Sequence, residues 1–239
     1  FKKAAQEVSP SPIVIRTLDI GMDKQLSFKG TNDEDNPALG LRGIRMSLAK
    51  PELFAIQLRA ILRASLHGEV KILYPMISDV QEIITANFIL ENVKREMREK
   101  QIPFDENVEV GAMIETPSAA ICSDRILEEI DFISIGTNDL IQYMLAVDRM
   151  NEQVAHLYQP YHPAILKILK HIFDNARIAG KKVSICGELG GDPLATLFLL
   201  GLGNLDSLSM DPHSIPHVKK IICQSSVNDA KDFSQQLLN

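Results

Sequence analysis

Short apolar runs alternate along the chain with longer segments in which apolar residues recur every three or four positions. The runs are apolar on both faces, which is typical of strands buried in a parallel sheet. Alternation of such strands with helices predicts a parallel α/β fold. We expect strands at residues 12–21, 70–76, 107–116, 131–139, 182–188 and 205–210.

The helical segments have clear boundaries and apolar stripes. Thr116 followed by Pro117 predicts a helix start, with Thr116 as the N-cap, and Gly180 predicts a helix end. Helical spacing of apolar residues indicates two buried faces. One face comprises Val80, Ile83, Ile84, Phe88, Val93 and Met97, and the other Ile165, Leu166, Ile168, Leu169, Ile172, Phe173 and Ala176.

The series of strand–helix units favours a TIM or (β/α)8 barrel over an open sheet, because no dinucleotide-binding glycine motif accompanies it. A barrel needs eight strands, whereas the pattern predicts six. On the pattern alone, either two β/α units precede residue 1 or the sheet is open. The chain starts without Met inside a helical pattern, FKKAAQEV. We therefore expect a fragment of a longer protein.

Composition and charge narrow the possible partners. A hydrophobic fraction of 45% and a charged fraction of 23% are those of an ordinary globular protein. The net charge of −6 gives no reason to expect binding to nucleic acid or to an anionic membrane. The chain has neither a signal-peptide pattern nor a run of roughly 18 apolar residues. Cys122, Cys186 and Cys223 follow no metal-binding or disulfide pattern, so we expect a cytoplasmic protein.

Polar residues stand at the ends of the predicted strands, where barrel enzymes assemble their sites. Any one of them could equally cap a helix or satisfy a loop, and an isolated cysteine is more often a core residue. Their coincidence at several strand ends favours a shared site. The residues are Arg16, Glu115, Asn138, Asp139 and Cys186, with Glu188 as a supporting residue.

The chemical types of these residues suit a site that binds a metal ion together with an anionic substrate. Glu115 and Asp139 offer the hard oxygen ligands that Mg²⁺ prefers, whereas zinc would require a cluster of His or Cys. Arg16, Arg42 and Arg149 lie in or near loops that follow strands. Because arginine binds carboxylate and phosphate through two hydrogen bonds, the three suggest a small, highly anionic substrate. Surface ion pairs are the alternative interpretation.

Several motifs together resemble one family along the whole chain, residues 1–239. The family is phosphoenolpyruvate-protein phosphotransferase, enzyme I of the bacterial phosphotransferase system, through its C-terminal domain that binds phosphoenolpyruvate (PEP). The stretch at residues 185–210, ICGELGGDPLATLFLLGLGNLDSLSM, resembles the nitrogen-related paralogue more than the sugar-transport enzyme. The motifs are RTLDIG (16–21), LGLRGIR (39–45), MIETPSAA (113–120), SIGTNDLIQYMLAVDR (134–149), LYQPYHPAIL (157–166) and ICGELGGDP (185–193).

The resemblance implies a (β/α)8 barrel whose first two β/α units lie before this chain. It also implies transfer of the phosphoryl group from PEP to a histidine on an N-terminal domain, with release of pyruvate. A histidine-containing phosphocarrier protein would be the next partner, and the protein would be a homodimer. By resemblance, Glu115 and Asp139 would hold Mg²⁺, Cys186 would be the proton donor, and Arg16, Arg42, Asn138, Asp139 and Arg149 would bind the substrate.

Two features depart from the family pattern. Met22 stands where the family has glycine, which puts the path of that loop in doubt. None of the six histidines lies in the glycine-rich Ser-His context of the family's phosphoacceptor. Alternatives are a barrel of the pyruvate phosphate dikinase and PEP synthase group, a PEP-sensing dimerisation module, and a metal-dependent aldolase or lyase. The sequence AVDR followed by LYQPYHP favours enzyme I.

Overall fold

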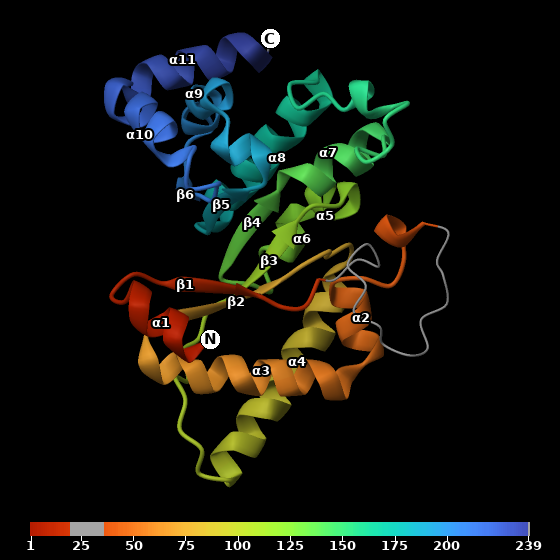
Figure 1. Ribbon diagram of the computed structural model, residues 1–239, viewed down its shortest axis with the longest axis vertical. Helices are drawn as coiled ribbons and strands as arrows, with labels where there is room; N and C mark the ends of the chain where they lie inside the picture. The colour runs from red at the N-terminus through yellow and green to blue at the C-terminus, as the bar shows by residue number, and fades with distance from the viewer. Residues whose placement is uncertain (20–35, 239) are drawn as a thin grey trace. The chain divides into compact units, whose positions relative to one another are not determined.

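The computed structural model describes residues 1–19 and 36–238, which form two compact units, Phe1–Ala112 and Met113–Asn239. Figure 1 gives the element labels used below. Met22 lies outside the described residues.

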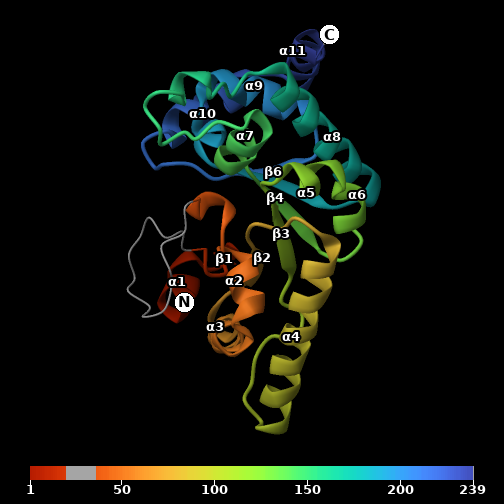
Figure 2. The same ribbon diagram turned by 90° about the vertical axis from the view of Figure 1, so that its right-hand side faces the viewer.

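The first unit combines parallel strands with helices. β1 (Ile13–Arg16) pairs with β2 (Val70–Tyr74), which pairs with β3 (Val110–Ile114), and both pairings are parallel. Helix α3 packs against β2, and α4 packs against α3 (Figure 2). The helices are α1 (Lys2–Val8), η1 (Pro37–Leu39), α2 (Ile44–Ala49), α3 (Pro51–Ala64), η2 (Ser65–His67) and α4 (Val80–Glu99).

The last two residues of β3 belong to the second unit, which continues with β4 (Phe132–Gly136), β5 (Lys182–Cys186) and β6 (Leu205–Leu208). β4 pairs in parallel with β5, and β5 with β6. Helices α9, α10 and α11 lie next to one another (Figure 1). The helices are α5 (Pro117–Ile121), α6 (Ser123–Ile126), α7 (Thr137–Leu145), η3 (Ala155–Leu157), α8 (Pro163–Ala179), η4 (Glu188–Gly191), α9 (Pro193–Leu202), α10 (Ile215–Gln224) and α11 (Val227–Leu238).

Helix boundaries follow the local signals in the sequence. The Thr116 hydroxyl caps α5 by accepting a hydrogen bond from the Ala119 N–H at 3.2 Å. Helix α8 ends at Gly180, whose φ of 66° is in the left-handed region that favours glycine. Both boundaries are as predicted.

The predicted buried stripe of α4 is only partly right. Ile83, Val93 and Met97 are buried, but Ile84 and Phe88 are exposed. The buried face instead continues through Ala86 and Leu90. One stripe of a helix about a third of its circumference wide contacts the core, and Ile84 and Phe88 lie outside it.

The predicted fold class is confirmed. The strands are parallel and occur in chain order, and helices separate successive strands along the chain. This arrangement is that of a partial (β/α)8 barrel. The strands are shorter than the apolar runs predict, because the last residues of several runs leave the sheet to begin loops or helices. Within the described ranges, no helix has both the length and the apolar character needed to cross a membrane.

Candidate active site

Gly136, at the end of β4, lies on the same face of the sheet as the side chains of Glu115 and Cys186. A Cβ atom placed on Gly136 would lie 2.5 Å from Oε2 of Glu115. The Glu115 side chain, only 1% exposed, therefore occupies the space that a larger residue would fill. Gly136 pairs with Cys186 on β5. Because paired residues of neighbouring strands carry their side chains on the same face, Glu115 and Cys186 share this face.

The thiol of Cys186 contacts β4. Its sulfur accepts a hydrogen bond from the Ser134 hydroxyl at 3.5 Å and donates one to the Ile135 carbonyl at 3.4 Å. The Thr137 hydroxyl also donates to the Cys186 carbonyl, at 2.9 Å. Cys186 is partly exposed, whereas Cys122 and Cys223 are exposed. The thiol of Cys186 is therefore held by strand contacts in a residue that is only partly buried.

Helix α7 starts directly after β4 and carries Asn138 and Asp139 in its first turn. The Asn138 side-chain oxygen accepts a hydrogen bond from the Glu188 N–H at 2.9 Å, which ties α7 to the turn after β5. Gly187 permits this approach, because its φ is 93° and a Cβ there would lie 2.8 Å from that same oxygen.

The carboxylate of Asp139 is buried next to a guanidinium group. Nη1 of Arg149 lies 3.5 Å from Oδ1 of Asp139. The Arg149 N–H donates to the side-chain oxygen of Gln142 at 3.3 Å, which fixes the backbone that presents this arginine. The Tyr158 hydroxyl donates to the Asn138 carbonyl at 3.4 Å. Burial raises the pKa of Tyr158 to about 12, although the neighbouring Arg149 acts in the opposite direction.

A pocket of about 420 Å³ opens beside Asn138 in the second unit. Its lining includes side chains able to accept or donate hydrogen bonds, namely those of Asn138, Glu188, Ser209, Asp211 and Ser214. Glu188 was expected only as a supporting residue, and here it lines the pocket.

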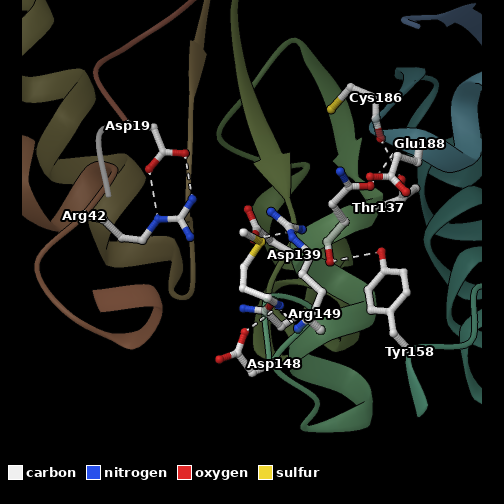
Figure 3. A network of polar contacts seen from close by, with 12 residues as sticks. Asp19, Arg42, Thr137, Asp139, Asp148, Arg149, Tyr158, Cys186 and Glu188 are labelled. Atoms are coloured by element: carbon white, nitrogen blue, oxygen red, sulfur yellow. Dashed lines mark hydrogen bonds and ion pairs between the residues drawn. The ribbon is translucent and has the colours of Figure 1, made fainter. Parts of the chain in front are cut away.

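In the first unit, Arg16 and Arg42 meet at a carboxylate that the sequence analysis missed. Arg42 donates from Nε to Oδ1 of Asp19 at 3.1 Å and from Nη2 to Oδ2 at 3.0 Å (Figure 3). Nη1 of Arg16 lies 3.6 Å from the same Oδ2. The Asp19 side chain is 2% exposed. A carboxylate three residues after Arg16, within the RTLDIG motif, was the signal that could have identified it.

Glu115 and Asp139 have the chemistry of Mg²⁺ ligands. Both are buried carboxylates, Glu115 directly after β3 and Asp139 in the first turn of α7. Mg²⁺ typically takes one or two protein carboxylates and completes its shell with water and substrate oxygens. In the parts of the chain that the structure describes, no three His, Cys, Asp or Glu side chains form a metal-binding group. A pair of carboxylates fits Mg²⁺, because water and substrate oxygens can complete its shell.

Residues 1–227 match the family model for the PEP-binding domain of PEP-utilising enzymes. The chain belongs to this family. It is 44% identical to the phosphoenolpyruvate-protein phosphotransferase of Buchnera aphidicola subsp. Schizaphis graminum over 100% of the chain and 42% of that relative. It is 47% identical to that of Haemophilus influenzae and 48% identical to that of Geobacillus stearothermophilus, in each case over 100% of the chain and 41% of the relative. The family predicted from the motifs is thus confirmed.

The chain spans about two fifths of the length of these curated relatives. Solved structures with similar folds include a citrate lyase from Burkholderia xenovorans LB400, with a TM-score of 0.52 and 18% identity over 70% of this chain and 53% of that one. Another is Haloferax volcanii malate synthase, with a TM-score of 0.53 and 14% identity over 70% of this chain and 50% of that one. At such low identity, these likenesses concern the fold alone.

Proposed function

We propose that this chain binds PEP and Mg²⁺ and supports phosphoryl transfer from PEP to a histidine on another domain, with release of pyruvate. This reaction would be the first step of a phosphotransferase relay, and a histidine-containing phosphocarrier protein would take the phosphoryl group next. The observation that carries the proposal is the gathering of Glu115, Asn138, Asp139, Arg149 and Cys186 around the ends of β3, β4 and β5 in a chain of the PEP-binding family.

PEP carries a phosphate and a carboxylate, and the proposed binding residues are complementary to both. Arginine offers donors in a planar fork that matches either group. Arg149 and Asn138 belong to the second unit, and the Arg149 side chain is one-third exposed, so part of it is open to an anion from solvent. The motifs support the same role for Arg16 and Arg42, and Asp19 fixes the orientation of the Arg42 fork.

Glu115 and Asp139 would hold Mg²⁺ through carboxylate oxygens. When bound, the metal would supply Lewis-acid stabilisation of charge on the phosphoryl and enolate oxygens. Arg149 beside Asp139 adds a fixed positive charge at the same place. A preorganised positive charge of this kind lowers the energy of a transition state in which negative charge moves between oxygens.

Loss of the phosphoryl group leaves the enolate of pyruvate, which must be protonated at carbon 3. In the proposal, the S–H bond of Cys186 breaks and the enolate electron pair forms the new C–H bond. The enolate oxygen becomes the carbonyl of pyruvate, and the sulfur keeps the S–H electron pair as a thiolate. In the reverse direction, the thiolate removes a methyl proton from pyruvate.

The test is exchange of the methyl protons of pyruvate with deuterated water, followed by NMR with the full-length protein and Mg²⁺. We expect Cys186→Ala to slow exchange by about 10²- to 10⁴-fold, the usual contribution of a positioned acid or base, while PEP binding is retained. Cys122→Ala is the matched control, because that thiol is exposed at the end of α5 and should leave exchange unchanged. Wild-type exchange in Cys186→Ala would exclude the cysteine as proton donor.

A phosphohistidine assay tests the phosphoryl transfer itself. Full-length protein incubated with PEP and Mg²⁺ should acquire one acid-labile phosphohistidine, and EDTA should prevent its formation. Binding of PEP without phosphohistidine would favour the sensing module instead. We further propose, from the family likeness, that the protein is a cytoplasmic homodimer. Sedimentation of the purified protein would test whether it is a dimer.

A further inference from the structure

Ser134 is a buried hydroxyl on the strand next to Cys186. Ser134 lies on β4 two residues before Gly136, and it is 5% exposed. In the parallel pairing, Ser134 pairs with Ser184 and Gly136 pairs with Cys186. Since side chains two apart on a strand point to the same face, Ser134 and Cys186 are diagonal neighbours on one face of the sheet.

The parallel register of β4 and β5 brings the sulfur of Cys186 against β4. There it accepts the Ser134 hydroxyl hydrogen bond at 3.5 Å and donates to the Ile135 carbonyl at 3.4 Å. A donor and an acceptor on the same strand together restrict rotation about the Cα–Cβ bond of Cys186.

The two contacts differ in what happens when the thiol loses its proton. The Ile135 carbonyl can only accept a hydrogen bond, so it loses its partner when the sulfur becomes a thiolate. The Ser134 hydroxyl can still donate, and hydrogen bonds to an ionised acceptor are stronger than those to a neutral one. The Ser134 contact therefore favours the sulfur after proton transfer.

We propose that Ser134 is a positioning residue for Cys186, a role that rests on the proposed function of the thiol as proton donor. Its hydroxyl holds the sulfur beside the enolate and donates to the thiolate after the S–H proton has moved to carbon 3. In the reverse step, the same hydroxyl holds the thiolate while it takes a methyl proton from pyruvate. Ser134 itself neither gains nor loses a proton.

Ser184 provides a matched comparison within the same pair of strands. Its hydroxyl donates to the Ile133 carbonyl at 3.2 Å, so it also bridges β5 and β4. The two serines pair with each other in the register. Substitution of Ser184 therefore removes one cross-strand hydrogen bond but no contact with the sulfur. Comparing the two serines shows whether Ser134 acts by stabilising the sheet or by holding the thiol.

The experiment measures deuterium exchange into the methyl group of pyruvate for Ser134→Ala, Ser134→Thr, Ser184→Ala and Cys186→Ala in the full-length protein. For Ser134→Ala we expect the maximal exchange rate to fall about tenfold, the effect of one hydrogen bond to a charged group, with the KM for pyruvate within about twofold of wild type. Ser134→Thr keeps the hydroxyl and should recover most of the rate. Ser184→Ala should exchange at the wild-type rate.

The outcomes separate this inference from the proposed function. If Cys186→Ala exchanges normally, the thiol is not the proton donor and the proposed function fails at this step. If Cys186→Ala is inactive but Ser134→Ala exchanges at the wild-type rate, the inference about Ser134 is wrong. An equal loss in Ser134→Ala and Ser184→Ala, or failure of Ser134→Thr to recover, would also overturn it. Phosphohistidine formation from PEP should be unaffected in Ser134→Ala, because P–O cleavage precedes protonation.

Discussion

At the scale of single residues, Arg16 and Arg42 of the first unit are held differently by the same carboxylate. Arg42 is 13% exposed and forms two hydrogen bonds to Asp19 through its planar fork. Arg16 is 49% exposed and makes a single contact with that carboxylate at 3.6 Å. A buried pair with good geometry is costly to break, whereas an exposed contact contributes little. Arg42 is therefore a structural residue as well as a predicted substrate-binding residue.

The substitution Arg42→Lys should lower the free energy of unfolding by about 2 kcal/mol, because lysine cannot reproduce the fork and leaves one oxygen of buried Asp19 without its donor. The matched change Arg16→Lys should cost less than about 1 kcal/mol. Urea denaturation of both variants measures the two losses. Equal losses would show that burial of Asp19 does not distinguish the two contacts.

At the scale of elements, the junction between β5 and η4 depends on the backbone of Gly187. Its φ is 93°, and a Cβ there would lie 2.5 Å from the Thr137 hydroxyl and 2.8 Å from the Asn138 side-chain oxygen. The start of α7 therefore packs directly against this turn. Gly180, at the end of α8, also has a positive φ of 66°, but no atom lies within 4 Å of its Cβ position.

The substitution Gly187→Ala should destabilise the protein by at least about 2 kcal/mol, since it combines an unfavourable backbone conformation with two close contacts. Gly180→Ala should cost only about 1 kcal/mol, the backbone contribution alone. Thermal and urea unfolding of both variants provide the comparison. Equal losses in the two variants would show that the close approach of α7 to Gly187 does not add to the cost of the Gly187→Ala substitution.

At the scale of the whole molecule, tyrosine hydroxyl groups in both units make the free energy of unfolding depend on pH in the alkaline range. Burial raises the pKa of Tyr158 to about 12, and it also raises the pKa of Tyr74 and of Tyr161. The Tyr161 hydroxyl in addition donates to the Asp192 carboxylate, which favours the neutral phenol. An unfolded chain releases these protons at a pH of about 10.

The free energy of unfolding should therefore be unaffected by these groups below about pH 10 and should fall as the pH rises from about 10 to about 12. In this window the unfolded chain has lost the phenol protons while folded Tyr158 keeps its own. Tyr158→Phe removes one titrating group and should make the decrease shallower. Urea denaturation at a series of pH values measures the slope, and an unchanged slope would contradict the assignment.

Most residues of the candidate site were predicted from the ends of the apolar runs in the sequence. Glu115, Asn138, Asp139 and Cys186 each come at or just after an apolar run, and parallel strands bring such ends to one edge of a sheet. The residues that contact the candidate site residues could not be predicted in this way. Asp19 and Ser134 lie within otherwise ordinary motifs, and their contacts with Arg42 and Cys186 join residues 23 and 52 positions apart along the chain.

The sequence by itself determined the elements, the parallel α/β class and the family, because apolar period, helix caps and motifs are local properties of the chain. Only the tertiary structure decided which neighbours these residues meet. The contact between Ser134 and Cys186 exists because β4 and β5 pair in a register that places the two side chains diagonally on one face. Likewise, Phe88 fits the helical period of α4 but is exposed. Register and helix orientation result from packing between distant segments, which no local pattern specifies.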